Sequence, residues 1–244
     1  MTIDRIAPTL RPDGSVAQHQ TWLDLLFLHW RVPVSMLRPL IPAALEIDTF
    51  EGDAFVGLVP FAMRDVRPVW APSVPGVSNF LETNVRTYVH CEGRDPGVWF
   101  FSLDAASRLA VGIARAFWHL PYHHATMSLD RLPDGSVRYV SDRTASPARV
   151  DVTYRPMGAP AASQPGTLEH FLAERYVLYA DVGEGDLRLG RVHHPPYPLQ
   201  TAQVIDWDES LLVAAGIARP AGEPLAHFAS GVDVEVFSLD PLRP

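Results

Sequence analysis

The sequence contains no lysine, since all 20 of its basic residues are arginines. This absence excludes every mechanism that needs a lysine amine, including Schiff-base decarboxylation, imine-based aldol chemistry and the attachment of pyridoxal phosphate. It also excludes a P-loop, whose lysine contacts the phosphates. A genomic preference for arginine codons explains the absence without selection on function, but the chemical exclusion holds in either case.

Cysteine is almost as scarce, because Cys91 is the only one in the sequence. A single cysteine forms no internal disulfide, which is typical of a reducing compartment. Residues 1–20 lack the apolar stretch of a signal peptide, and no apolar run approaches the roughly 20 residues of a membrane-spanning helix. The net charge of -8 at pH 7 disfavours binding to nucleic acid or anionic membranes. We therefore expect a cytoplasmic protein with neither of these partners.

The apolar pattern predicts many strands and few helices. With 47% hydrophobic and 20% charged residues, the chain of 244 residues has the composition of a globular protein. About ten strands are indicated, among them residues 22–30, 54–63, 82–90, 97–103 and 231–239. Helices are expected at 34–40, at 105–117 with Asp104 as the cap, and at 167–174, and a long loop is expected at 157–166. This pattern predicts an α+β, mainly β fold with an antiparallel sheet or barrel.

The most informative strand carries polar residues on one face. Side chains alternate along a strand, so Glu82, Asn84, Arg86 and Tyr88 share a face, and Val85 lies on the other. Such a face either is exposed to solvent or lines a wet cavity. On this segment alone the exposed face, with a weak ion pair, is favoured.

The ten histidines suggest a metal site, but their spacing disfavours one. His119 and His123 are four residues apart, as on a metal-binding helix, yet Pro121 interrupts that helix and no HExxH motif is present. Adjacent histidines, such as His193 and His194, point to opposite faces of a strand. We therefore expect structural histidines, with no bound metal and no cofactor.

Seven segments, taken in order, resemble the YqjF-like family known as domain of unknown function 2071. They are His29-Trp30-Arg31-Val32-Pro33, Leu45-Glu46-Ile47-Asp48, Val56-Gly57-Leu58-Val59-Pro60-Phe61, Glu82-Thr83-Asn84-Val85-Arg86-Thr87-Tyr88, Gly97-Val98-Trp99-Phe100-Phe101-Ser102-Leu103-Asp104, Leu120-Pro121-Tyr122 and Val192-His193-His194-Pro195-Pro196. This family is similar to the acetoacetate decarboxylase-like superfamily. The resemblance implies a single domain over residues 1–244, with 1–18 as an N-terminal extension. It further implies an antiparallel β-barrel or cone that encloses a ligand cavity, with a few peripheral helices.

The resemblance also suggests roles for individual residues. In the decarboxylases an arginine holds the substrate carboxylate and a glutamate lies beside the reaction centre, and these positions resemble Arg31 and Glu82. The lysine pair follows a proline, and the corresponding positions after Pro121 look like Tyr122 and His123. Because neither can form an imine, the acetoacetate decarboxylase reaction is excluded.

A barrel interior would turn the polar face of the strand into a cavity wall. The candidate catalytic residues are Glu82, Tyr122 and His123, and the candidate substrate-binding residues are Arg31, Asn84, Arg86 and His193. One hypothesis is a lysine-independent lyase or isomerase acting on a small carbonyl or carboxylate compound. The alternatives are a noncatalytic protein that binds a small ligand, or an internal Glu82–Arg86 ion pair in a filled barrel. A homo-oligomer is compatible with this fold, although no residue indicates one.

Overall fold

The computed structural model describes residues 3–183 and 185–242 and is built mainly of strands. The strands are β1 (Val16–Val32), β2 (Glu46–Ile47), β3 (Ala54–Pro68), β4 (Phe80–Cys91), β5 (Arg94–Ala105), β6 (Tyr122–Arg131), β7 (Val137–Arg143), β8 (Arg149–Ala161), β9 (Val177–Asp181), β10 (Leu187–His193), β11 (Leu199–Glu209), β12 (Leu225–Phe237) and β13 (Asp240–Pro241). The helices are α1 (Val34–Leu37), α2 (Arg108–Trp118), α3 (Leu168–Ala173) and α4 (Leu211–Ala214), with 3-10 turns at Ala7–Thr9 and Arg38–Leu40. The fold is therefore mainly β, as predicted.

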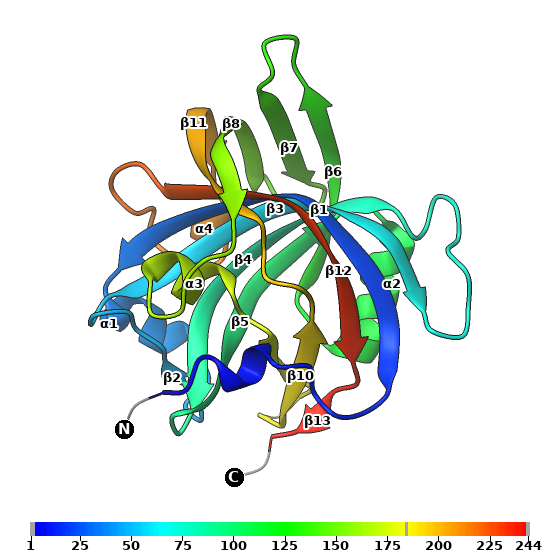
Figure 1. The fold of residues 1–244 in the computed structure, drawn as a ribbon, viewed down its shortest axis with the longest axis vertical. Coiled ribbons are helices and arrows are strands. Elements are labelled where there is room, and N and C mark those ends of the chain that lie inside the picture. Colours follow the sequence, from blue (N-terminus) through cyan, green and yellow to red (C-terminus); the bar gives the residue numbers. More distant parts are fainter. Residues whose placement is uncertain (1–2, 184, 243–244) are drawn as a thin grey trace.

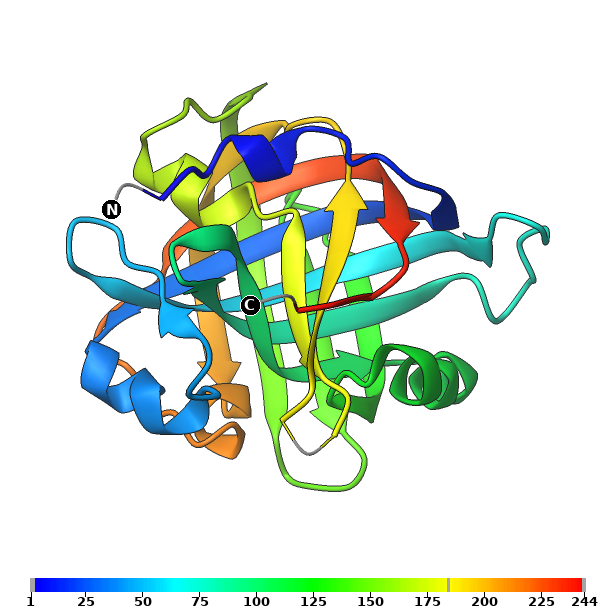
Figure 2. The same cartoon turned by 90° about the horizontal axis from the view of Figure 1, so that it is seen from below.

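The sheet closes on itself into a ring. Successive pairings run β1–β3–β4–β5–β9–β10–β12, and β12 pairs again with β1. Only the β5–β9 pairing in this ring is parallel. The strands β6, β7, β8 and β11 lead from β5 back to β12 and form a second ring on the other side of β1, β3 and β4. The long strands β1, β3 and β4 cross the middle of the molecule, and α1 and α2 lie at opposite sides of it (Figures 1 and 2).

Strands β1, β3 and β4 belong to both rings, and they separate the filled interior of the second ring from the hollow interior of the first. On β1, Leu26 and Leu28 face the second ring and pack with the tyrosines Tyr139 and Tyr154 of β7 and β8. Phe27, which lies between them in sequence, points the other way and belongs to a separate hydrophobic cluster on the side of the first ring. Because both faces of β4 are covered, its polar residues from Glu82 to Thr87 are buried whichever way they point. The second ring is filled with side chains, and the first ring contains the cavity described below.

Two elements differ from the prediction. Residues 157–161, expected in a loop, continue strand β8 and pair with β11. The sequence did not indicate β11 because a register shift between Val204 and Asp206 interrupts the alternation of its core-facing residues. Helix α2 begins at Arg108, where the Ser107 hydroxyl accepts a hydrogen bond from the backbone of Ala110. Asp104, the predicted cap, instead forms a fully buried ion pair with Arg143 at 2.6 Å. The side chains of residues 113–117, on which the predicted apolar face of this helix depended, lie outside the described part.

Helix α3 agrees with the prediction for residues 167–174, since the Thr167 hydroxyl caps it by accepting from the backbone of His170. Within residues 3–183 and 185–242, no helix has the length and apolar character needed to span a membrane.

Candidate functional site

The first ring encloses a cavity of about 120 Å³, which is room for several water molecules or a small organic ligand. Its walls are mostly apolar and come from β1, β3, β4, β5, β6, β9, β10 and β12, with the end of α2 and the segments before β9 and β11. Among the side chains that line it, the polar ones include Gln20, Glu82, Asn84, Arg86 and Arg175, with the tyrosines Tyr122, Tyr176 and Tyr197. An apolar cup with a few convergent polar groups is typical of a ligand site.

Strand β4 supplies the polar wall by alternation. Glu82, Asn84 and Arg86 all line the cavity, whereas Val85 packs in the core of the second ring. The prediction that these three polar residues share one face is confirmed, and the alternative of an exposed face is wrong, because each is at most 8% exposed. The internal Glu82–Arg86 ion pair is absent too, since neither side chain lies within 4 Å of an opposite charge among the described residues.

Glu82 is a buried acid with no cation within ion-pair distance among the described residues. The hydroxyl of Tyr122 donates a hydrogen bond to its Oε2 at 3.0 Å, and the side chain of Asn84 also bonds to it. Burial raises the pKa of Glu82 to about 8, which outweighs the lowering effect of these two hydrogen bonds. The same desolvation, with Glu82 as neighbour, raises the pKa of Tyr122 well above its ordinary value. At neutral pH this wall of the cavity therefore carries a mostly protonated carboxyl group that can ionise.

Arg86 is a buried cation without a carboxylate partner. Its Nη2 donates to the carbonyl of Leu172 at 2.9 Å, and its guanidinium lies over the rings of Phe27 and Tyr88. Its Nε has no hydrogen-bond partner. Buried charges are normally paired, so a guanidinium that faces a cavity with no carboxylate partner among the described residues is an unusual feature of this wall.

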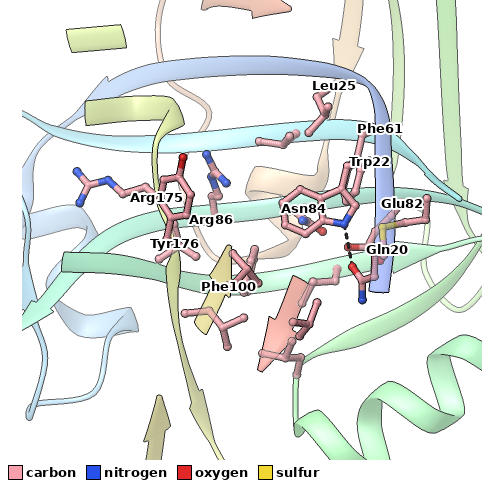
Figure 3. Close-up of a pocket in the computed structure, with 18 of the residues that line it drawn as sticks. Gln20, Trp22, Leu25, Phe61, Glu82, Asn84, Arg86, Phe100, Arg175 and Tyr176 are labelled. Carbon is pink, nitrogen blue, oxygen red and sulfur yellow. Dashed lines mark hydrogen bonds between the residues drawn. The ribbon is translucent and has the colours of Figure 1, made fainter. Parts of the chain in front are cut away.

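Arg175, which the sequence analysis missed, lines the cavity next to Arg86 (Figure 3). Its Nη1 donates to Asp48 at 2.8 Å and its Nε donates to the carbonyl of Phe171 at 2.7 Å, but its Nη2 has no partner. Asp48 also binds Arg5 of the N-terminal segment. No sequence signal pointed to this pair, because Asp48 is one of four acidic residues between positions 46 and 53.

A hydrogen-bond network holds Arg86 in place. The Tyr88 hydroxyl donates to the carbonyl of Leu172, and it lies 2.6 Å from His29 Nε2. Because a phenol has one proton, His29 is the donor in that second contact. Burial lowers the pKa of His29 well below its ordinary value, so the ring is neutral. The Leu172 carbonyl thus accepts from both Arg86 and Tyr88.

Gly57 has no side chain, and the His29 ring of this network packs directly against it. A substitution at this position therefore tests how closely the network is packed. Gly57 pairs with His29 on β1 and with Arg86 on β4, and a Cβ at this position would lie 3.0 Å from the His29 ring. Gly57→Ala should lower the free energy of unfolding by about 1–2 kcal/mol because the ring must shift. Urea denaturation measures this. Gly112→Ala on α2, where a Cβ meets nothing within 4 Å, is the control and should be neutral or stabilising.

Three predicted site residues do not reach the cavity. Arg31 is exposed at the end of β1 and pairs with Asp53 at 3.0 Å, so it is not the buried arginine that the resemblance suggested. His123 follows Tyr122 on β6 and is half-buried outside the cavity lining, because neighbouring strand residues face opposite sides. His193 lies near Glu235 at 3.7 Å, also away from the lining.

The neighbour of His193 is closer to the site. His194 is buried between the rings of Tyr176 and Tyr197, both of which line the cavity, and its Nδ1 donates to the carbonyl of Pro195. Burial lowers the pKa of His194 to about 4, so this residue is a neutral part of the aromatic wall. Among the described residues, no group of three or more histidine, cysteine and acidic side chains is arranged to hold a metal.

Comparison with known proteins agrees with this architecture. The model of the family DUF2071, described as an uncharacterized conserved protein, matches residues 19–233. The uncharacterized protein YqjF of Bacillus subtilis (strain 168) is 42% identical over 229 residues, which cover 93% of each chain.

Solved structures with similar folds have much lower sequence identity. The enduracididine biosynthesis enzyme MppR complexed with pyruvate has a TM-score of 0.65 at 15% identity, covering 96% of this chain and 92% of that one. An acetoacetate decarboxylase-like enzyme from Sphingomonas wittichii RW1 has a TM-score of 0.65 at 13% identity, covering 94% of both chains. Acetoacetate decarboxylase from Legionella pneumophila has a TM-score of 0.61 at 12% identity, covering 96% of this chain and 94% of that one. These similarities show the acetoacetate decarboxylase-like fold.

Proposed function

We propose that this chain, which belongs to the DUF2071 family, binds a carboxylic acid in its cavity and moves a proton on it without a lysine imine. In this proposal the protein is an isomerase or lyase that acts on a small carbonyl-containing acid. The substrate stays noncovalently bound, because the sequence has no amine that could attack the carbonyl.

The observation that carries the proposal is the unpaired guanidinium of Arg86. It is 8% exposed, has no carboxylate within ion-pair distance among the described residues, and leaves its Nε unbonded. Arg175 adds a second unbonded nitrogen, Nη2, at the same end of the cavity. A carboxylate accepts such charge-assisted hydrogen bonds from two directions, and guanidinium groups suit it geometrically.

Glu82 is the proposed proton carrier. A carboxyl with a pKa of about 8 is a stronger base, when ionised, than an ordinary glutamate. It can take a proton from a carbon next to a carbonyl group, and the Tyr122 hydroxyl beside it can donate to the carbonyl oxygen as that oxygen gains charge. The pyruvate complex of MppR, a protein of the same fold, supports a carbonyl-containing acid as the class of ligand.

The proposal predicts that Arg86→Met weakens carboxylate binding without destabilising the protein. Loss of a charge-assisted hydrogen bond should raise the Kd of a keto acid about 10-fold to 100-fold. The free energy of unfolding should stay the same or rise, because the substitution removes an uncompensated buried charge and the Leu172 carbonyl keeps its bond from Tyr88. Calorimetric titration of keto acids and their amides, together with urea denaturation, measures both effects.

The exposed Arg31 provides the matched control. Arg31→Met should leave the Kd unchanged, because its guanidinium is outside the cavity. If no keto acid binds more tightly than its amide, or if Arg86→Met binds it equally well, the proposal is wrong. Binding without any proton exchange would instead support a noncatalytic ligand-binding protein.

A further inference from the structure

We infer that the bound acid is an elongated keto acid, with its reacting carbonyl several carbons away from its carboxylate. The inference rests on the proposed function and specifies its substrate class. It comes from the placement of the two kinds of polar group, which lie at opposite ends of the cavity (Figure 3).

The distance between these groups follows from their positions on one strand. Glu82 and Arg86 are four residues apart on β4, and the pairing of this strand with β3 runs without a register shift from Phe61 opposite Glu82 to Gly57 opposite Arg86. At about 3.3 Å per residue, their Cα atoms are roughly 13 Å apart. The side chain of Arg86 reaches Leu172, next to Arg175, and Figure 3 shows the two arginines at one end of the cavity and Glu82 at the other.

The middle of the cavity suits a hydrocarbon chain. Val59, which pairs with Asn84, lines it from β3. Phe27 lies under the Arg86 guanidinium and Phe100 pairs with Arg86, so both continue the apolar wall toward the arginine end. Asn84 lies between the two ends in Figure 3; its side chain bonds to Glu82, and its buried Oδ1, the one polar atom of this section, has no partner among the described residues. A ligand held at both ends therefore crosses a largely apolar section, and contact with that section favours methylene groups over water.

The far end is built for a hydrogen-bond acceptor. The single proton of the Tyr122 hydroxyl is donated to Glu82 Oε2, so the O–H of the protonated Glu82 carboxyl is the group that can donate to a ligand. A ketone oxygen accepts from it, and its neighbouring C–H bond is then next to Glu82. In the reaction, that C–H bond breaks, the proton goes to ionised Glu82 and the electron pair moves to the ketone oxygen. Return of the proton to carbon restores the carboxylate, so no other reactant is consumed.

A series of ligands with matched ends tests the inference by calorimetric titration. The wild type should bind 6-oxoheptanoate about tenfold more tightly than either pyruvate, which is too short, or heptanoate, which lacks the ketone. In the double variant Glu82→Leu/Tyr122→Phe the advantage of the ketone should disappear. Heptanoate should bind the double variant at least as tightly as it binds the wild type. Such binding also shows that the double variant is folded.

The outcomes separate this inference from the function on which it rests. If pyruvate binds as tightly as 6-oxoheptanoate, or if the ketone gives no advantage over heptanoate, the elongated ligand is wrong, while carboxylate binding that depends on Arg86 still stands. If no acid binds in an Arg86-dependent way, the proposed function itself fails. Should the double variant not fold, the comparison of the three ligands in the wild type still decides the question.

Discussion

Glu82→Gln should slow proton exchange on a bound keto acid about 100-fold to 10,000-fold, the usual contribution of a general base. The amide has nearly the shape of the carboxyl group and can still bond to Tyr122 and Asn84, so the Kd should change little. What it cannot do is accept a proton from carbon. Deuterium incorporation from D₂O next to the ketone of 6-oxoheptanoate, followed by proton NMR, measures this without knowledge of the natural substrate.

Two controls identify Glu82 as the group responsible. Glu209 is also a buried carboxyl with a raised pKa, but it lies at the start of α4 and bonds to the backbone of Leu212, outside the cavity lining. Glu209→Gln should therefore exchange at the wild-type rate. In the wild type the exchange rate should rise with pH and level off above about pH 8, as Glu82 becomes ionised. Exchange that persists unchanged in Glu82→Gln would remove Glu82 from the mechanism.

Local periodicity was sufficient to predict the polar wall of the cavity. Alternation along β4 depends only on neighbouring residues, so it correctly grouped Glu82, Asn84 and Arg86 and separated them from Val85. What alternation could not decide was whether this face met water or an enclosed space. That depends on the closure of the sheet through the β5–β9 and β10–β12 pairings, which join segments far apart in the chain.

The arginine end of the cavity shows where local reasoning failed. Arg31 is on the same side of β1 as Phe27 and His29 by alternation, but it lies at the end of the strand beside Asp53, beyond the cavity. The arginine that lines the cavity instead, Arg175, is fixed by Asp48, which is 127 residues away in sequence. No spacing rule connects two residues so far apart, so this pair could be found only in the folded chain.

The second large effect expected from Glu82 is on stability. Its pKa is about 8 in the folded protein and 4.5 in the unfolded chain. Below pH 4.5 both states hold the proton, and this residue adds no pH dependence. Between pH 4.5 and 8 only the folded state holds it, so the free energy of unfolding falls as the pH rises, by on the order of 5 kcal/mol in total. Above pH 8 both states are ionised and the loss is complete.

A comparison with Glu82→Gln separates this effect from the titration of other groups. Glu174 and Glu209 also have raised pKa values and contribute in the same direction, but both are present in the variant as well. The difference in free energy of unfolding between Glu82→Gln and the wild type, from urea denaturation at pH 5 and at pH 8.5, should therefore shift in favour of the variant at the higher pH. An unchanged difference would mean that Glu82 is not held in a desolvated site. Since the same desolvation makes Glu82 a strong base, the stability cost and the proposed proton transfer have one physical origin.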